Sequence, residues 1–367
     1  MDFTMRDLKA KELLEYDFLD DWKEVSNIEI YDEFVDTVDL DKYFIYKMAT
    51  LNNKPDEIYK NSLNYWEAVR DKYARKKGRG YVYCIEDPDT YSEKLQNIYK
   101  AIYEDNYLNI TKDNEGRICG DTMNSITTTM SKYFRLIYAD DEKYYRSKIK
   151  GNGFINECGK PYNGSLSQSL EIYIREKDSE KLKESISEDA KNFIRYSHTL
   201  GNFIPVPAKT FNVPRSTSTK DYWDLTLLRI YNWYKENESS DKSLKKDAIL
   251  KTVENECDCN KNKELCLLLG RNRANVKLCI KWLCEFGSWD SFVKKNYMQS
   301  FVIEEGNGNY GEPLELWKGH FERNEDSTFK NPMPLCKEQC EEFFKNATER
   351  IKERSENMAE KFQQNNR

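Results

Sequence analysis

The chain has 367 residues, a net charge of −6 and a high aromatic content of 25 Tyr, 17 Phe and 7 Trp. Large rings bury the area that offsets chain entropy, so this composition excludes a disordered chain and predicts one large folded domain or two ordinary ones. The acidic balance excludes non-specific nucleic-acid binding through a uniformly basic surface. Local basic patches remain at 70–77 and 271–273, although a solvated helix face is the ordinary explanation of each.

No stretch approaches the roughly 18 apolar residues of a membrane helix, and residues 1–22 are too acidic for a signal peptide. We therefore expect a cytoplasmic protein with no membrane partner and with its ten cysteines reduced. The CDC sequence at 257–259, Cys266, and the pair Cys336 and Cys340 lack the paired knuckles and histidines of most zinc sites. Buried apolar thiols are the favoured interpretation, and a Cys-only zinc site is the alternative.

The first element expected along the chain is a helix over 55–77. Acidic residues open this segment, basic residues close it, and apolar residues recur every three or four positions. A short strand is expected at 81–86 and a second helix at 89–105.

Residues 120–138 begin with the polar sequence GDTMNS and continue as an apolar stripe with helical spacing. Asp121 or Thr122 is predicted to be the N-cap, since its side-chain oxygen can accept hydrogen bonds from the free amides of a first turn. The β-branched run at 127–129 is stiff in a helix. A polar, Thr-rich start of this kind is also compatible with a segment that faces a cleft.

The segment 141–165 contains four glycines, predicts loops, and is the one place where the sequence suggests a domain boundary. Further helices are expected at 168–196, 221–236, 242–255, 262–286, 289–300 and 335–364, with an ordered loop or short hairpin at 201–220 and irregular structure at 301–334. The predicted fold class is mostly α (α+β). It consists of a compact multi-helix domain over 1–334 with a few short strands, and a charged helical tail over 335–367.

The sequence RYSHTLGNFIPVP, residues 195–207, holds one of only two histidines in the chain. This region carries the residue types that a nuclease uses as base, metal or scaffold amides and phosphate-binding cations: His198, Asn202, Asn212, Arg215, Lys220 and Asp221. Gly201 is expected to adopt backbone angles that other residues avoid, which suits a tight turn. In the structural alternative, His198 ends a helix, where its ring binds the last carbonyls and interacts with the helix dipole. The second histidine, His320, lies among aromatic residues and is typical of a packing histidine.

The HTLGN sequence, an apolar run, Asn212 and Lys220 together resemble the closing segment of the HNH-like module in GmrSD-type restriction enzymes. The resemblance covers residues 197–220 and implies scaffold positions for His198, Asn202, Asn212 and Lys220. In such modules a catalytic histidine stands earlier, in a motif of the form Asp/Glu-His-Ile-x-Pro. This chain has no such motif, so the resemblance supplies no general base.

A second resemblance rests on five stretches: GDTMNS (120–125), HTLGNFIPVP (198–207), DYWDLTLLRIYNWY (221–234), CIKWLCEFGSWDSFVKKNYMQSFV (279–302) and ELWKGHF (315–321). These are similar to a family of uncharacterised proteins from low-GC gut bacteria. The resemblance implies a bacterial, cytoplasmic origin and a single long domain, and it carries no catalytic residues across.

No Walker A loop, GxGxxG fingerprint, GxSxG elbow or HExxH motif occurs, so no cofactor is expected. The favoured hypothesis is a macromolecule-binding or effector protein in a defence or restriction setting. Its partner is unknown, and nucleic acid is a candidate through the local basic patches.

The alternative hypothesis is a divergent HNH-like nuclease that depends on a divalent metal such as Mg²⁺ or Mn²⁺. Its candidate catalytic residues are His198, Asn202, Asn212, Lys220, Asp121 and Asn124. Convergence of these residues on one cleft would favour the enzyme. A buried His198 with both ring nitrogens bonded would disfavour it.

Overall fold

The computed structural model describes residues 14–16, 18, 74–77, 80–83, 88–124, 129, 133, 136, 187–208, 211–219, 222–255 and 260–365. Most of these residues are helical, the strands are short, and a long helix follows them near the C-terminus. The predicted fold class, mostly α with a few short strands, is therefore confirmed. Within this part of the chain, none of the helices is long and apolar enough to cross a membrane. The boundary predicted near 141–165 lies outside the described residues.

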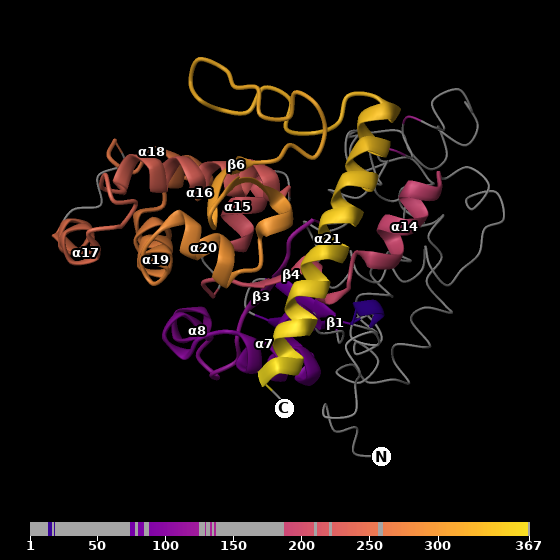
Figure 1. Ribbon diagram of the computed structural model, residues 1–367. Coiled ribbons are helices and arrows are strands. Elements are labelled where there is room, and N and C mark those ends of the chain that lie inside the picture. Colours follow the sequence, from indigo (N-terminus) through magenta and orange to yellow (C-terminus); the bar gives the residue numbers. More distant parts are fainter. Residues whose placement is uncertain are drawn as a thin grey trace.

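The helices are α6 (Pro88–Tyr91), α7 (Glu93–Ile102), α8 (Asp105–Thr111), α14 (Glu188–Tyr196), α15 (Asn212–Thr219), α16 (Trp223–Asn237), α17 (Lys246–Asn255), α18 (Lys263–Leu268), α19 (Arg273–Cys284), α20 (Trp289–Lys295) and α21 (Lys337–Asn365), with short 3-10 turns η3 (Leu200–Asn202) and η4 (Gln299–Phe301). The strands pair as antiparallel hairpins or bridges: β1 (Ala74–Lys77) with β2 (Gly80–Tyr83), β3 (Gly120–Thr122) with β4 (Phe203–Pro205), and β5 (Val302–Gly306) with β6 (Asn309–Pro313). Figure 1 shows α21 running between α14 on one side and the group α15–α20 on the other.

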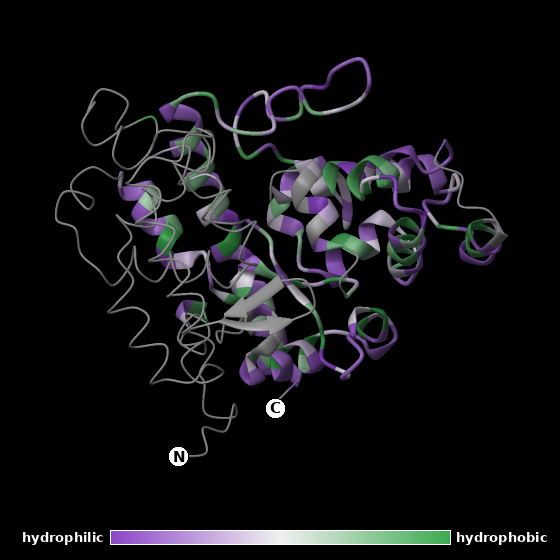
Figure 2. Cartoon of the chain, turned by 180° about the vertical axis from the view of Figure 1, so that it is seen from behind, coloured by the Kyte–Doolittle hydropathy of each residue, from purple (hydrophilic) through white to green (hydrophobic). Residues whose placement is uncertain are grey.

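Helix α21 is the long C-terminal helix that the sequence predicts, and one of its faces is buried. The buried side chains along it recur at helical spacing and include Phe343, Phe344, Ile351 and Met358. The helix packs against α14, η3, α7 and η4, which come from distant parts of the sequence. In the hydropathy colouring of Figure 2, purple and green bands alternate along the helices, as expected where one face meets the core.

The sheet β3–β4 joins two segments that are far apart in the sequence. Asp121 lies opposite Ile204 in this sheet. The prediction that Asp121 or Thr122 caps a helix is therefore wrong, because both residues belong to a strand. The first residue of that strand, Gly120, has to be glycine, because a Cβ at this position would overlap the backbone carbonyl oxygen of Asp89.

The helix predicted over 55–77 is wrong at its end, since residues 74–77 pair with 80–83 as strands β1 and β2. The rest of that prediction lies outside the described residues. The sequence KKGRGY holds two glycines, which is more typical of a hairpin turn than of a helix that continues. The strand expected at 81–86 is present in part, as the end of β2.

Helix α15 occupies a segment for which the sequence predicts a loop or hairpin. Its third residue, Pro214, is accommodated because the first turn of a helix has no intrahelical acceptor for a backbone N–H. Two other predicted helices divide at caps. Ser92 accepts a hydrogen bond from Leu95 N at 3.1 Å and separates α6 from α7. Gly270 separates α18 from α19.

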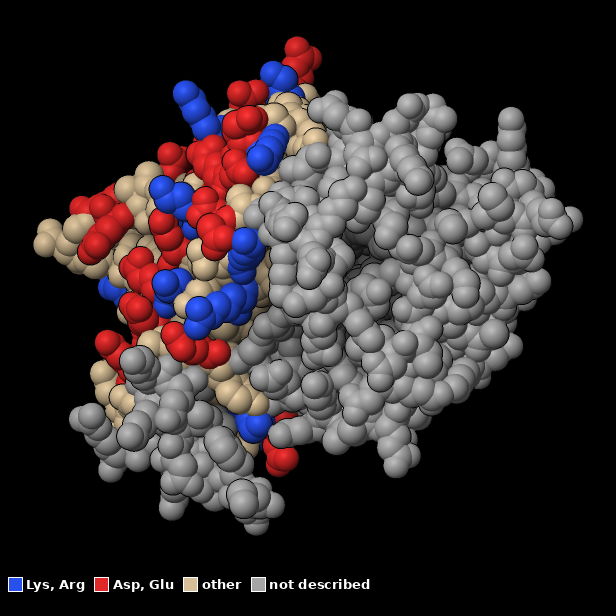
Figure 3. Space-filling view, turned by 90° about the vertical axis from the view of Figure 1, so that its right-hand side faces the viewer, with Lys and Arg blue, Asp and Glu red and all other residues tan. Residues whose placement is uncertain are grey.

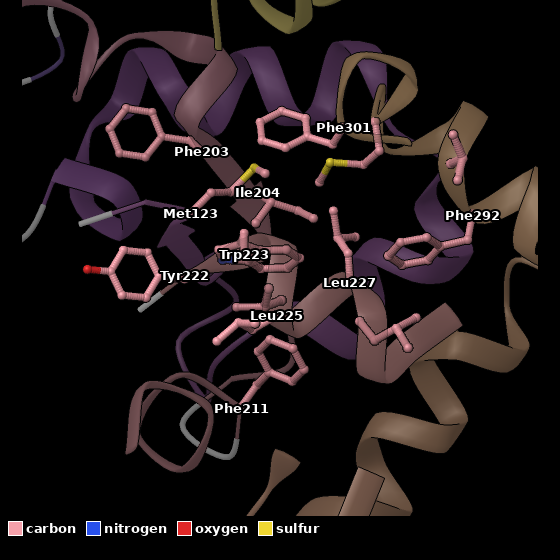
Figure 4. Close-up of a cluster of buried hydrophobic side chains, with 14 of the residues drawn as sticks. Met123, Phe203, Ile204, Phe211, Tyr222, Trp223, Leu225, Leu227, Phe292 and Phe301 are labelled. Atoms are coloured by element: carbon pink, nitrogen blue, oxygen red, sulfur yellow. The ribbon is translucent and has the colours of Figure 1, made fainter. Parts of the chain in front are cut away.

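The core is rich in aromatic rings. Figure 4 shows Trp223 in the middle of a buried cluster. The side chains around it come from β4, α16, α20, η4 and residues next to β3, α15 and α16: Met123, Phe203, Ile204, Phe211, Tyr222, Leu225, Leu227, Phe292 and Phe301. Trp282 packs edge-on against Phe211, with ring centroids 5.5 Å apart. The aromatic composition therefore accounts for the core, as the sequence indicates.

Candidate functional site

The segment after α14 places the first candidate residue, His198, inside the protein. Helix α14 ends at Tyr196, whose carbonyl accepts a hydrogen bond from Thr199 Oγ1 at 2.8 Å. The His198 side chain is 2% exposed, its Nδ1 lies 3.0 Å from Ser197 Oγ, and its ring meets Phe203 edge-on. The histidine thus stands at the C-terminal end of a helix, as the structural alternative expects.

The Asn202 side chain binds the backbone of Asn124, next to the β3–β4 sheet. Asn124 N donates to Asn202 Oδ1, and Asn202 Nδ2 donates to Asn124 O, both at 3.0 Å. Asn202 Nδ2 also donates to Ser197 O at 2.6 Å, and Asn124 Oδ1 accepts from Trp223 N at 3.3 Å. These two buried amides therefore tie the end of α14, the end of β3 and the start of α16 together.

Asp121 forms a buried ion pair beneath the same sheet. Its Oδ2 lies 2.8 Å from Arg215 Nη2 and accepts a hydrogen bond from Trp223 Nε1 at 3.1 Å. The Arg215 guanidinium also lies over the Trp223 ring, 5.5 Å from its centroid. Asn212 Nδ2 donates to Gly120 O at 3.1 Å. Both contacts attach α15 to β3, since Asn212 and Arg215 lie on that helix.

The structure thus brings five of the six candidate residues together around β3 and β4: Asp121, Asn124, His198, Asn202 and Asn212. The sixth, Lys220, lies outside the described residues. Four of the five are buried, and most of their bonds run to backbone groups or to each other. Asn124 Nδ2 and Asn212 Oδ1 are the buried atoms of this set that have no hydrogen-bond partner among the described residues. The arrangement connects segments of the fold, and the catalytic roles of these residues stay predictions.

Sequence reasoning missed the contact between this region and α21. Gly201 N donates to Ser355 Oγ at 2.7 Å, and a Cβ at position 201 would overlap the carbonyl oxygen of Ile351. Gly201 is not among the described glycines with positive φ, so the expectation of unusual backbone angles is wrong. The residue is required for space, because the backbone of α21 passes directly against it. The only sign of this contact in the sequence was Gly201 itself, which the sequence analysis interpreted as a turn residue.

Arg354 of α21 completes the contact, and its side chain is fully buried. Its guanidinium donates to the carbonyls of Gly201 at 2.8 Å, Phe203 at 2.7 Å and Asn296 at 3.0 Å, and to Tyr103 Oη at 3.2 Å. Burial raises the pKa of Tyr103 to about 12, while the charge of Arg354 acts in the opposite direction. The phenol therefore stays protonated and serves as an acceptor for Arg354.

His320 forms a second buried centre, built on a carboxylate that the sequence did not indicate. Its Nδ1 lies 2.6 Å from Asp224 Oδ2, which also accepts from Leu316 N at 2.9 Å. The ring stacks on Trp317 and meets Tyr222 edge-on. This aromatic packing is as expected, and His320 Nε2 is buried without a hydrogen-bond partner among the described residues. The two histidines have separate sets of neighbours.

Among the described residues, no group of three or more His, Cys, Asp or Glu side chains is arranged to hold a metal ion. Cys257 and Cys259, two members of the alternative zinc site, lie outside the described residues. Cys266 and Cys340 are buried, as expected for apolar thiols, whereas Cys336 is half-buried. Burial also raises the pKa of Cys284 to about 12, which keeps that thiol protonated.

A different kind of surface lies on residues 261–281, called here the basic hairpin, which include α18, the turn after it and the first nine residues of α19. It contains six Lys or Arg residues and a single acidic residue, Glu264. Glu264 is buried and binds Arg229 and Arg323, each at 2.8 Å, so its charge is neutralised inside the protein. In Figures 1 and 2 this part of the molecule lies at the end away from α21.

The cations of the basic hairpin are mostly available to a partner. Arg271 and Arg273 are exposed, Lys277 is half-buried, and none of the three forms an ion pair with another described residue. By contrast, the face shown in Figure 3 carries both signs of charge interspersed among its described residues. The sequence pointed to this surface in part, since 271–273 is one of its two basic patches.

Comparisons of the chain with protein-family models, with curated proteins and with solved structures found no match. Both resemblances stated above therefore stay predictions.

Proposed function

We propose that this protein binds a macromolecule, that the macromolecule is nucleic acid, and that the contact is made by the basic hairpin. The observation that carries the proposal is the local charge. Six cationic residues within 261–281 stand beside one carboxylate, which is buried and already paired with Arg229 and Arg323. A surface of this kind attracts phosphate through Coulomb forces and through the release of condensed counterions.

The remainder of the protein supports a defined orientation on such a partner. The whole chain carries a net charge of −6, so residues outside the basic hairpin are acidic on balance. The acidic remainder of the protein repels a polyanion, whereas the basic hairpin attracts it. Lys261, Arg271, Arg273 and Lys277 are the cations of the basic hairpin whose side chains form neither an ion pair nor a hydrogen bond with another described residue. Neutralising about four phosphates gives a salt dependence with a slope of about −3 to −4.

The state of the predicted catalytic residues favours binding over catalysis. His198 is enclosed by the protein, and Asn202 and Asn124 bind backbone groups. A nuclease at this position would need the substrate phosphate to reach side chains that water does not reach. A bacterial origin and a defence or restriction setting remain part of the proposal only through the two sequence resemblances.

The experiment is fluorescence anisotropy with a labelled DNA duplex of about 20 base pairs, roughly two helical turns, titrated over a series of NaCl concentrations. The variant Arg273→Gln/Lys277→Gln should weaken binding and reduce the salt slope by about 2. The matched control, Lys318→Gln/Lys345→Gln, removes the same charge from exposed positions elsewhere and should leave the slope unchanged. Equal losses in both variants, or no binding by the unaltered protein, would refute the proposal.

The same samples test the alternative function. After incubation with Mg²⁺ or Mn²⁺, the DNA and a parallel RNA sample are examined for cleavage. Cleavage that disappears in His198→Ala, with the variant still folded, would establish the nuclease in place of the simple binding protein.

A further inference from the structure

We infer that the basic hairpin is a helix–turn–helix unit that inserts α19 into the major groove of duplex DNA. This inference rests on the proposed function and deepens it, since phosphate binding alone requires neither a duplex nor a groove. It is carried by a second set of observations, the backbone geometry of the turn and the burial pattern of the two helices.

The turn between the helices has the length and the caps of such a unit. Helix α18 ends in a left-handed Gly270, with φ of 66°, and Arg271 N donates to Cys266 O at 2.7 Å. This 6→1 bond is the Schellman closure of a helix end. Asn272 Oδ1 then accepts from Ala274 N and Asn275 N, at 3.0 and 3.3 Å, and caps α19. A turn of three or four residues that contains Gly is the connection found in helix–turn–helix units.

The apolar residues of both helices fix their relative position against the core. They are buried at helical spacing and include Leu265, Leu269, Val276, Cys279 and Ile280. Helix α16 packs against α18, and α17 packs against α19, so the pair is held from two sides. The hairpin is therefore a supported unit that presents a fixed outer face, as groove recognition requires.

The outer face of α19 carries the side chains that read bases. Arg273, Lys277 and Lys281 follow each other at intervals of four residues and share one side of the helix. Arg273 and Ala274 are exposed, and Lys277 is half-buried. In the major groove, Arg pairs with guanine through two parallel hydrogen bonds.

The charges around the helix favour contact through its first half. Lys281, in the second half, lies 3.5 Å from Glu254 of α17. At the start of α18, Lys263 binds Ser327 Oγ at 2.7 Å and lies near the exposed Asp326. Within the described part of the chain, the cations nearest the turn, Arg271 and Arg273, form no ion pair with an acidic side chain. Recognition helices contact base edges with their N-terminal residues.

The width of the groove decides which duplex can accept α19. The major groove of B-form DNA is about 12 Å wide and admits an α-helix of about 10–12 Å in diameter. The major groove of A-form RNA is deep and narrow and excludes side chains carried on a helix. A protein that binds phosphates only would not distinguish the two duplexes so strongly.

The test compares three probes of one sequence, a DNA duplex, an RNA duplex and a single DNA strand, with heparin as a polyanion without bases. We expect the DNA duplex to bind about tenfold or more tightly than the RNA duplex at equal salt. Selection from random DNA duplexes should enrich a short motif. Arg273→Lys, which keeps the charge but cannot form two parallel hydrogen bonds with guanine, should relax the preference at one position of that motif and leave the salt slope unaltered.

Arg271→Asn is the matched variant for phosphate contact. It removes a charge from the turn at a φ of 59° that Asn tolerates, so the hairpin stays folded. It should weaken binding to all DNA duplexes by a similar factor and keep the motif. Equal affinity for the DNA and RNA duplexes with no enriched motif overturns the inference, while salt-dependent binding that persists leaves the proposed function standing. Absence of binding to every probe, heparin included, refutes both.

Discussion

The centre of the molecule and the basic hairpin use polar side chains in opposite ways. At the centre, Asn202, Asp121 and Arg354 are buried, and their polar atoms bind backbone groups and each other. On the basic hairpin, Arg271 and Arg273 are exposed and form no ion pair with described residues. Burial, which depends on tertiary packing, thus separates polar side chains that connect segments of the protein from polar side chains that a partner can reach.

Substitution of Arg354 should give the largest loss of stability. Arg354→Leu removes the guanidinium donor from the carbonyls of Gly201, Phe203 and Asn296. The free energy of unfolding should fall by about 3–5 kcal/mol, measured by urea denaturation. The neighbouring exposed substitution Glu353→Gln should change it by less than about 0.5 kcal/mol. A small effect of Arg354→Leu would mean that the centre is not held by its polar contacts.

Gly201 tests whether close approach or backbone conformation requires glycine. Gly201→Ala should destabilise the protein by about 2–3 kcal/mol, because the added methyl group overlaps the backbone of α21. Gly201→Asn should be no better. Gly116 is the matched control, since its φ is 81° and the space around it is open. There Asn should be tolerated better than Ala, and rescue of position 201 by Asn would contradict the steric explanation.

Asn272 tests the turn of the basic hairpin. Asn272→Ala removes the acceptor of two backbone N–H groups at the start of α19 and should cost about 1 kcal/mol. Thermal denaturation followed by circular dichroism measures this change. Asn272→Asp should retain the cap, so a loss as large as that of Ala would show that the cap is not the reason.

Arg271 should give the smallest change in stability and the sharpest contrast with the centre. Because its φ is 59°, Arg271→Asn relieves a strained conformation and should raise the free energy of unfolding by about 0.5 kcal/mol. The same substitution should weaken DNA binding. A variant that becomes more stable while binding less would show that this side chain serves a partner, whereas a clear loss of stability would place Arg271 with the framework.

Local patterns in the sequence predicted the helices well where one apolar stripe dominates. The expected helix over 221–236 corresponds to α16, and the one over 335–364 to α21. The errors arose where the position of a single residue decides the outcome. Pro214 lies in the first turn of α15 and therefore does not prevent that helix, and Gly270 divides one expected helix into two. Caps and first-turn positions act over one or two residues, so a pattern averaged over many residues misses them.

The candidate site shows the same division between local and long-range information. Of the six residues that the sequence singled out as types a nuclease could use, the five that the structure describes lie around β3 and β4. The sequence could not show that Asn202 would bind Asn124, or that Asp224 would meet His320, since those partners are separated by 78 and 96 residues. Which polar groups face a partner and which face the interior depends on the packing of distant segments.

The sequence by itself determined that the chain folds, that it is mostly helical, and that its core is aromatic. These properties follow from composition and from periodicity, which depend on neighbours within one helix. The tertiary structure decided that α21 packs against the HTLGN segment, residues 198–202. It also decided that Glu264, the one carboxylate of the basic hairpin, is buried and paired with arginines. Both outcomes depend on contacts between remote segments, because only the folded chain sets which backbone a glycine touches and which arginines a glutamate meets.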